Sequence, residues 1–312
     1  MNIQQFQYIL AVAEHKHFEL AAEKCFISQS TLSTMISRFE DEIGFKIFDR
    51  KKKPVQLTNE GAIIIEQLKI IANNIEQLKE LTSIVKGEIK GSLTLSVIPT
   101  IAPFLLPIFL QDFATKFPNL KIKVREETTT EIIQKLKSRE LDIGILSTPL
   151  KDNEILEIKL YDEPFLFFDA EQVANDYITL EEIKMKNLCL MEEGHCMRTQ
   201  VMQLCDNGDS QNGAKFNFEY KAGSIDSLLR FVKANKGTTL LPYLATIDFS
   251  KQEKTHLSNF LTPIPYRSVG MVVHRHFVKK NLLDILQKDI TKIIMPILNK
   301  MEIDGERLYP LI

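Results

Sequence analysis

Apolar residues in the first part of the chain recur every three or four positions, the spacing of amphipathic helices. One helix is predicted from Ile3 to about His15, and a second short one from about Phe18 to Cys25. A third is predicted to run to about Glu42, with Ser28 as N-cap and Gly44 after its end. The apolar face of the third helix is formed by Leu32, Ile36, Phe39 and Ile43.

The sequence of helix, short turn and helix is the spacing of a helix-turn-helix, whose second helix enters the major groove of DNA. The polar face of the third predicted helix carries small polar side chains and one arginine, which can reach base edges and phosphates. These candidate DNA-contacting residues are Ser28, Gln29, Ser30, Thr31, Ser33, Thr34, Ser37 and Arg38.

A basic cluster follows in the segment FDRKKKPVQLT, which is predicted to form a short hairpin or wing. Arg50, Lys51, Lys52 and Lys53 form the kind of cluster that neutralises phosphates. A solvated basic loop is the alternative for such a cluster taken alone. Its position directly after the predicted helix-turn-helix favours a DNA contact.

A long helix is predicted from Thr58 to about Lys86, with apolar residues in alternating steps of four and three. Such a pattern suits pairing with the same helix of a second copy, and packing against its own domain is the alternative. The residues of this stripe are Ile64, Leu68, Ile71, Ile75, Leu78 and Val85. Gly87 and Gly91 then break the helix. We therefore expect a DNA-binding domain at 1–60, a linker and dimerisation helix at 61–90, and a regulatory domain at 91–312.

After Gly91 the pattern alternates between strands and helices, which predicts a mostly parallel sheet covered on both faces. Strands are predicted at SLTLSVIP, LKIKVREE, LDIGILS, EPFLFFD, NLCLMEE, TTLLP and SVGMVVH, with a last amphipathic helix near 280–299. Ligands of such sheets bind at the carboxyl ends of strands, where the sequence places Thr100 and Ser147.

Composition excludes several classes of protein without identifying a partner. Among the 312 residues, 44% are hydrophobic and 26% are charged, and the formal net charge is −2. These values are ordinary for a globular protein. No apolar stretch approaches the roughly 18 residues that a membrane span requires, and the N-terminus lacks a signal-peptide pattern. The expected compartment is the cytoplasm, where cysteines are reduced at rest.

Two cysteines nine residues apart, Cys196 and Cys205 in EEGHCMRTQVMQLC, indicate a thiol switch. If 197–205 form one helix, the nine-residue offset separates the two cysteines by about 13.5 Å along its axis. A disulfide requires Cα atoms closer than about 7 Å. Joining the two sulfurs would therefore require this helix to unwind. Zinc binding by His195 and the cysteines lacks a fourth ligand, so we predict no metal and no cofactor.

The N-terminal residues closely resemble the winged helix-turn-helix of LysR-type transcriptional regulators. The matching positions are Ala21-Ala22, Ser28-Gln29, Leu32-Ser33, Glu40, Gly44, Phe48, Arg50, Leu57-Thr58 and Gly61. Ser30 stands where the family commonly has proline, and Phe39 stands where leucine is usual. The resemblance extends over essentially the whole chain and implies an all-α winged domain with a long linker helix, followed by an α/β regulatory domain. Two subdomains like those of periplasmic binding proteins are expected, with crossings near 162–165 and 266–270.

Within that family the regulatory domain is most similar to the peroxide-sensing members, through motifs such as Gly194-His195-Cys196. The resemblance implies that Cys196 is the peroxidatic cysteine and Cys205 its resolving partner. It also implies that Thr100, Thr129, His195 and Arg267 surround hydrogen peroxide. Its further implications are double-stranded promoter DNA as partner, a homotetramer built from two dimers, and contact with RNA polymerase.

Two other functions are open at this point. The regulatory domain can instead bind a small metabolite, with the cysteines incidental to its function. A thiol peroxidase is the third possibility, and the DNA-binding module argues against an enzyme. For Cys25 and Cys189, which lie in apolar patterns, we expect buried, unreactive thiols.

Overall fold

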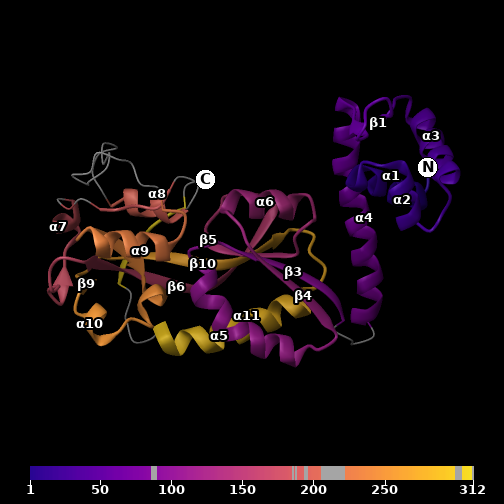
Figure 1. The fold of residues 1–312 in the computed structure, drawn as a ribbon. Coiled ribbons are helices and arrows are strands. Elements are labelled where there is room, and N and C mark those ends of the chain that lie inside the picture. Colours follow the sequence, from indigo (N-terminus) through magenta and orange to yellow (C-terminus); the bar gives the residue numbers. More distant parts are fainter. Residues whose placement is uncertain are drawn as a thin grey trace. The chain divides into compact units, whose positions relative to one another are not determined.

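The computed structural model describes residues 1–85, 90–184, 186, 188–192, 196–204, 222–298 and 304–310 (Figure 1). The chain divides into two compact units. One comprises Met1–Glu88 with Ser138–Glu140, and the other comprises Ile89–Lys137 with Leu141–Ile312.

The first unit is a helix-turn-helix with a two-stranded wing. Its elements are α1 (Ile3–His15), α2 (Phe18–Lys24), α3 (Gln29–Ile43), β1 (Phe48–Asp49), β2 (Gln56–Leu57) and α4 (Asn59–Val85). The predicted caps of α3 are present, because Ser28 accepts a hydrogen bond from the Thr31 amide and Gly44 adopts a left-handed conformation. Phe39 stands where leucine is usual in the LysR-type regulators that this domain resembles. It packs edge-on against Phe6, with ring centroids 5.9 Å apart.

The apolar stripe of helix α4 is buried at its first turns and exposed further along. Ile65 and Leu68 are buried in the core of the first unit, with Ile64 partly buried against that core. Ile71 and Leu78 are 40% and 63% exposed. The first turns of the helix therefore pack on their own domain, and the exposed positions further along remain available to a second copy.

The second unit begins with three parallel strands, β3 (Gly91–Val97), β4 (Leu120–Glu126) and β5 (Ile143–Thr148). Helices α5 (Ala102–Lys116) and α11 (Lys280–Leu298) lie together on one face of this part of the sheet, and α6 (Thr129–Lys137) lies on the other (Figure 1). The carboxyl ends of the three strands lie at one edge, since Val97 pairs with both Glu126 and Ile145.

Two long strands, β6 (Ile155–Asp169) and β10 (Ile264–His274), join the two halves of the second unit. The first part of β6 pairs with β10, and its last five residues pair with β8. The sheet order is β4-β3-β5-β10-β6-β9-β7. The remaining elements are β7 (Tyr177–Ile178), α7 (Leu180–Lys184), α8 (Cys196–Met202), α9 (Ile225–Ala234), β8 (Thr238–Pro242), the 3-10 turn Tyr243–Thr246, α10 (Lys251–Lys254), β9 (Leu257–Phe260) and β11 (Gly305–Arg307).

The fold class agrees with the prediction, whereas several details differ. The sheet is mixed, because β10 runs antiparallel to both β5 and β6. Residues 188 to 192, predicted as part of a strand, make only isolated bridges at Leu188 and Met191. Helix α8 ends at Met202, so the expected helix over 197–205 is wrong. At this end, the Leu204 amide donates to the carbonyl of Val201, three residues back.

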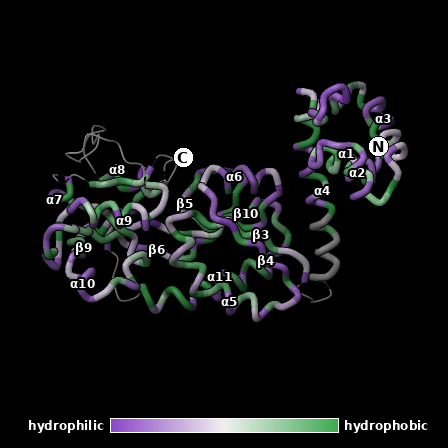
Figure 2. The backbone as a smooth tube through the Cα atoms, viewed as in Figure 1, coloured by the Kyte–Doolittle hydropathy of each residue, from purple (hydrophilic) through white to green (hydrophobic). Residues whose placement is uncertain are grey.

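Two hydrophobic clusters fill the second unit, one under each half of the sheet. The first contains Leu95, Ile145 and Phe109, and the second contains Phe165, Leu240 and Leu228. Figure 2 shows the corresponding hydrophobic stretches along the central strands, with hydrophilic residues concentrated in the connections. Among the described helices, none is long and apolar enough to cross a bilayer.

Candidate functional site

Four polar residues share one face of the sheet where β5, β10 and β6 lie side by side. Val269 of β10 pairs with Ser147 on one side and Tyr161 on the other. Two residues earlier on β10, Arg267 pairs with Glu163. Because side chains alternate between the faces of a strand, Ser147, Tyr161, Glu163 and Arg267 project from the same face. All four are buried.

Arg267 is the centre of a buried hydrogen-bonded group. Its Nε donates to Oε2 of Glu163 at 2.9 Å, and Nη2 lies 2.8 Å from the same oxygen. Nη1 and Nη2 donate to the hydroxyl and carbonyl oxygens of Thr100, each at 3.0 Å. Glu163 also accepts a hydrogen bond from the Leu244 amide at 2.8 Å. These contacts fix Thr100 just beyond the carboxyl end of β3.

Cys196 is the first residue of α8, and its thiol lies over this face of the sheet. The Sγ atom donates a hydrogen bond of 3.7 Å to the Ser147 hydroxyl. The side chain of Cys196 packs with the first hydrophobic cluster, whereas Met197 and Val201 of the same helix pack with the second. Only 6% of Cys196 is exposed.

Tyr161 adds an unusual polar atom to this face. Its hydroxyl is buried and has no hydrogen-bond partner among the described residues. Burial and, secondarily, the nearby Glu163 carboxylate raise the pKa of this phenol well above its ordinary value. The group is therefore a neutral hydrogen-bond donor at physiological pH, because the charged form is disfavoured on both counts.

The remaining predicted site residues have different surroundings. Thr129 is buried at the start of α6, beyond the carboxyl end of β4 and so at the same sheet edge as Thr100. Arg198, two residues after Cys196, donates to the Met191 carbonyl at 3.0 Å. His195 and Cys205 lie outside the described residues.

Cys25 and Cys189 are half-buried rather than fully buried. Burial raises the pKa of both thiols, and a hydrogen bond from the Thr238 amide offsets part of this rise at Cys189. A raised pKa reduces the thiolate fraction, so both sites have the low reactivity expected from their apolar sequence context.

Helix α8 is attached to the C-terminal segment through two glutamines. Gln200 donates to the Leu308 carbonyl at 3.2 Å. Gln203 donates to the Tyr309 carbonyl at 2.6 Å and accepts from the Tyr309 amide at 3.0 Å. Leu308 is buried in the second hydrophobic cluster, which also contains residues of α8. This segment is therefore held both by α8 and by β10, with which β11 pairs.

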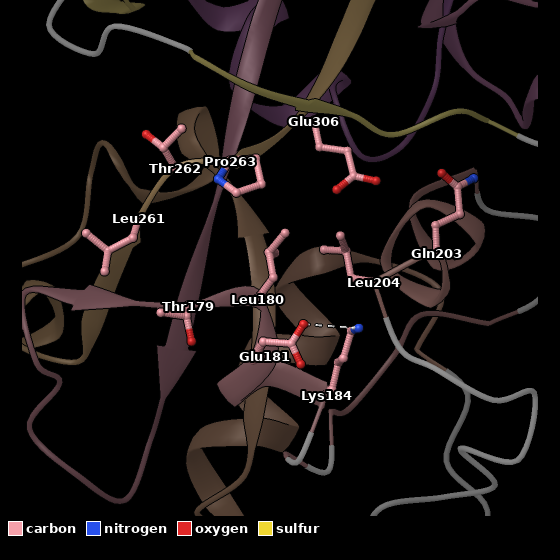
Figure 3. Close-up of a pocket in the computed structure, with 10 residues that line it drawn as sticks. All are labelled: Thr179, Leu180, Glu181, Lys184, Gln203, Leu204, Leu261, Thr262, Pro263 and Glu306. Atoms are coloured by element: carbon pink, nitrogen blue, oxygen red, sulfur yellow. Dashed lines mark hydrogen bonds and ion pairs between the residues drawn. The ribbon is translucent and has the colours of Figure 1, made fainter.

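A cavity of about 540 Å³ lies beside the end of α8 (Figure 3). Its lining mixes apolar, hydroxyl and charged side chains from α7, from the residues before β10 and from β11. Glu181 and Lys184 of α7 form an ion pair at 3.4 Å on its wall.

Among the described residues, no group of three or more His, Cys, Asp or Glu side chains could hold a metal ion.

Most of the predicted DNA-contacting residues are exposed in the first unit. Ser28, Gln29, Ser30, Thr31, Thr34, Arg38 and the basic residues 50–53 are exposed, and Ser33 and Ser37 are half-buried. Ser28 is also engaged locally, because its hydroxyl lies 3.0 Å from that of Ser30 and 2.8 Å from that of Thr31. These short contacts organise the first turn of α3.

Arg50 joins the wing to α3 instead of extending into solvent. Its Nη1 donates to the Ser33 hydroxyl at 2.8 Å, and its Nη2 donates to Ser37 at 3.1 Å and to buried Glu40 at 3.2 Å. The guanidinium also lies 4.8 Å from the ring centroid of Phe18. Arg50, Ser33 and Ser37 therefore form an internal bridge, whereas the adjacent exposed Lys51, Lys52 and Lys53 lie outside it.

Glu163 and Tyr161 are site residues that the sequence interpretation did not include. Ser147 was placed at a strand end, but its contact with Cys196 was not foreseen. Glu163 stands in the Asp162-Glu163-Pro164 motif, and a buried carboxylate there could have been inferred from the need to balance Arg267. The unpartnered hydroxyl of Tyr161 has no signal in the sequence.

Each of the two units matches a known protein family. Residues 3–62 match the bacterial regulatory helix-turn-helix of the lysR family, and residues 86–285 match the LysR substrate binding domain. The DNA-binding transcriptional dual regulator OxyR of Escherichia coli K12 is 32% identical over 275 residues, covering 87% of this chain and 89% of that protein. A probable hydrogen peroxide-inducible genes activator of Streptomyces viridosporus is 29% identical over 276 residues, covering 87% and 88%.

Solved structures show the same relationship. A full-length OxyR variant from Pseudomonas aeruginosa superimposes with a TM-score of 0.73 at 28% identity, covering 93% of this chain and 98% of that one.

Proposed function

The chain belongs to the LysR family of DNA-binding transcriptional regulators, and we propose that it senses hydrogen peroxide through a reversible disulfide between Cys196 and Cys205. In this proposal residues 1–60 bind promoter DNA, 61–90 link and dimerise, and 91–312 sense the oxidant. The regulated genes are those of the oxidative stress response, with the protein acting as an activator. The names of the relatives support this assignment.

The proposed chemistry has two steps. The Cys196 thiolate attacks one peroxide oxygen, so that an S–O bond forms, the O–O bond breaks and hydroxide leaves to become water. The sulfur is thereby oxidised by two electrons to a sulfenic acid. The Cys205 thiolate then attacks this sulfur, the S–S bond forms, and the hydroxyl leaves as a second water.

The observation that carries the proposal is the position of the Cys196 sulfur, 3.7 Å from the Ser147 hydroxyl over a polar buried face. A hydroxyl at this distance can hydrogen-bond a developing thiolate or a bound peroxide oxygen. Thr100, fixed by Arg267, supplies a second preorganised hydroxyl at the same sheet edge. Such donors lower a barrier in which charge develops on the departing oxygen. In our proposal, Thr129 and His195 complete the peroxide site.

Arg267 has a positioning role in this scheme. Its charge is balanced by Glu163, so its principal effect is to fix the Thr100 hydroxyl. Each Nη atom of a guanidinium carries two N–H groups, and Nη1 therefore retains one N–H beyond that given to Thr100. This N–H is the donor that we assign to the peroxide.

Oxidation is coupled to structure through α8. Cys196 begins this helix, and Gln200 and Gln203 connect it to the C-terminal segment. A disulfide that draws Cys196 toward a residue beyond the end of the helix requires α8 to change shape. Both hydrophobic clusters then lose side chains, because Cys196 belongs to one and Met197 to the other.

We further propose a cytoplasmic homotetramer built from two dimers, which binds promoter DNA and contacts RNA polymerase. The exposed Ile71 and Leu78 of α4 support pairing of linker helices. A concentration series in analytical ultracentrifugation, before and after oxidation, would measure the assembly.

Thiol mapping by mass spectrometry before and after a brief peroxide pulse tests the main proposal. The expected product is one intramolecular disulfide between Cys196 and Cys205, with altered promoter occupancy. Cys25→Ser is the matched control and should respond normally. A Cys196→Ser protein that still changes its promoter occupancy on peroxide addition would reject the thiol switch.

A small metabolite as the signal is the second candidate, and the 540 Å³ cavity beside α8 favours it. In that case the response would require a ligand of mixed apolar and polar character and would persist without Cys196. The Cys196→Ser measurement therefore also decides between the two candidates.

A further inference from the structure

Phe26 occupies a backbone position in the helix-turn-helix that normally belongs to glycine. Helix α2 is followed by Cys25 as its C-cap, and Phe26 then takes a positive φ of 56°. The Phe26 amide donates to the Glu23 carbonyl and the Ile27 amide donates to the Ala22 carbonyl, both at 3.1 Å. This pair of hydrogen bonds is the Schellman motif, whose left-handed residue is usually glycine or asparagine.

The conformation is costly for phenylalanine, and folding gains little in return. A bulky side chain at positive φ places its Cβ close to the following carbonyl group. The ring of Phe26 is 96% exposed, whereas the flanking Cys25 and Ile27 pack against the core. A strained residue that buries none of its apolar surface is typical of a functional contact.

The location of Phe26 identifies the partner. Two residues later, Ser28 caps α3, the recognition helix of a family that binds DNA. The first turn of such a helix contacts base edges, and the preceding helix crosses the DNA backbone. Phe26 lies in the turn between them, three and four residues before the exposed Gln29 and Ser30 of the recognition helix. DNA offers two apolar partners at this edge of the major groove, the thymine methyl group and the deoxyribose ring.

We propose that the Phe26 ring packs against an apolar group of the bound DNA at the edge of the recognition helix. The left-handed backbone keeps the ring projecting from the turn. This assignment adds an uncharged contact to a surface otherwise made of hydroxyl, amide and cationic side chains. It rests on the family's DNA binding and is independent of the proposed peroxide chemistry.

The test measures folding and binding of the same variants of the full-length protein. Phe26→Asn and Phe26→Gly keep the left-handed conformation and remove the ring. Their Tm should equal or exceed that of the wild type. Their affinity for a duplex that the wild-type protein enriches from a random library should fall about tenfold, on the scale of half-burying an aromatic side chain. Val173→Asn, at an exposed apolar residue of the second unit, is the control and should bind normally.

Three further readouts sharpen the result. The salt dependence of binding should keep its slope, because the ring neutralises no phosphate. Replacing thymine by deoxyuridine weakens wild-type binding if the methyl group is the partner, and leaves it unchanged if the deoxyribose is. Wild-type affinity in both variants, or a changed salt slope, would overturn the proposal. A changed oligomeric state with unaltered DNA affinity would also overturn it, in favour of a second copy as the partner.

Discussion

Glu163 and Arg267 face each other on β6 and β10, and their charged groups meet at 2.8 Å with at most 1% of either side chain exposed. The pair lies where the two long strands connect the halves of the regulatory unit. Burying two charges is costly in itself, so the pair is maintained by its geometry and its additional hydrogen bonds to Thr100 and the Leu244 amide.

Glu163→Gln should destabilise the protein by about 3–5 kcal/mol, because it leaves a buried guanidinium without its counter-charge. Urea unfolding of the two proteins measures the difference. The control is Glu154→Gln, which removes a partner of Lys137 from an exposed pair and should cost less than about 1 kcal/mol. Replacing both Glu163 and Arg267 with methionine should recover part of the loss. Equal stability of Glu163→Gln and wild type would contradict the assigned role.

Ser147→Ala should slow oxidation of Cys196 by about tenfold, because the hydroxyl that is hydrogen-bonded to the sulfur is lost. Stopped-flow trapping of the sulfenic acid at several peroxide concentrations gives the rate constant. Ser258→Ala removes another buried serine hydroxyl, in β9, and serves as the control. An unchanged rate in Ser147→Ala would show that this hydroxyl only packs against the thiol.

Neutralising Lys51 should weaken binding to specific and non-specific duplexes alike and reduce the salt slope by about 0.9, if it contacts one phosphate. Arg50→Ala should behave differently, because Arg50 is bonded to Ser33, Ser37 and Glu40. We expect it to lower stability and displace the wing. Fluorescence anisotropy over a salt series, together with a thermal melt, separates the two effects. Identical behaviour of both variants would refute the internal bridge.

Acid should remove a stabilising contribution of Glu253. Hydrogen bonding to Lys233 and to Ser250 lowers the pKa of this carboxyl from 4.5 to about 2. The contribution is therefore complete above pH 4.5 and is lost as the pH falls toward about 2. Since the side chain is 35% exposed, we expect only about 1 kcal/mol. Glu253→Gln should be less stable than wild type at neutral pH and equal to it in strong acid. A constant difference across this range would contradict the prediction.

Oxidation should increase amide hydrogen exchange in residues 304–310. Gln200 and Gln203 bond to Leu308 and Tyr309 of this segment, in addition to the pairing of β11 with β10. Exchange followed by mass spectrometry in the reduced and oxidised protein measures the change, with Cys196→Ser under peroxide as the control. Gln203→Ala should produce part of the increase without oxidation. A mapped disulfide with unchanged exchange would show that the segment keeps its place by other contacts.

Local patterns predicted the first unit well because its helices are amphipathic and properly capped. Ser28 and Gly44 are found at the predicted ends of α3. The fold of the second unit was harder to predict from the sequence, because strand pairing joins residues that are far apart in the chain. The antiparallel position of β10 between β5 and β6 follows from the tertiary fold, and no local pattern specifies it.

The candidate site illustrates the same difference. Family resemblance selected Thr100 and Arg267, which hydrogen-bond in the structure. It could not supply Ser147 as the neighbour of Cys196, because this contact depends on how α8 lies over the sheet. The length of α8 was overestimated, since the helical pattern continues past Met202 whereas the backbone hydrogen bonds shorten from four residues to three at Leu204.

The division of α8 between two cores has a mechanical consequence. Cys196 is anchored in one half of the regulatory unit, and its immediate neighbour Met197 is anchored in the other. A displacement of either residue at this junction therefore disturbs the packing of both halves. In the proposed switch, a chemical change at one sulfur atom therefore affects the packing of both halves through two adjacent residues.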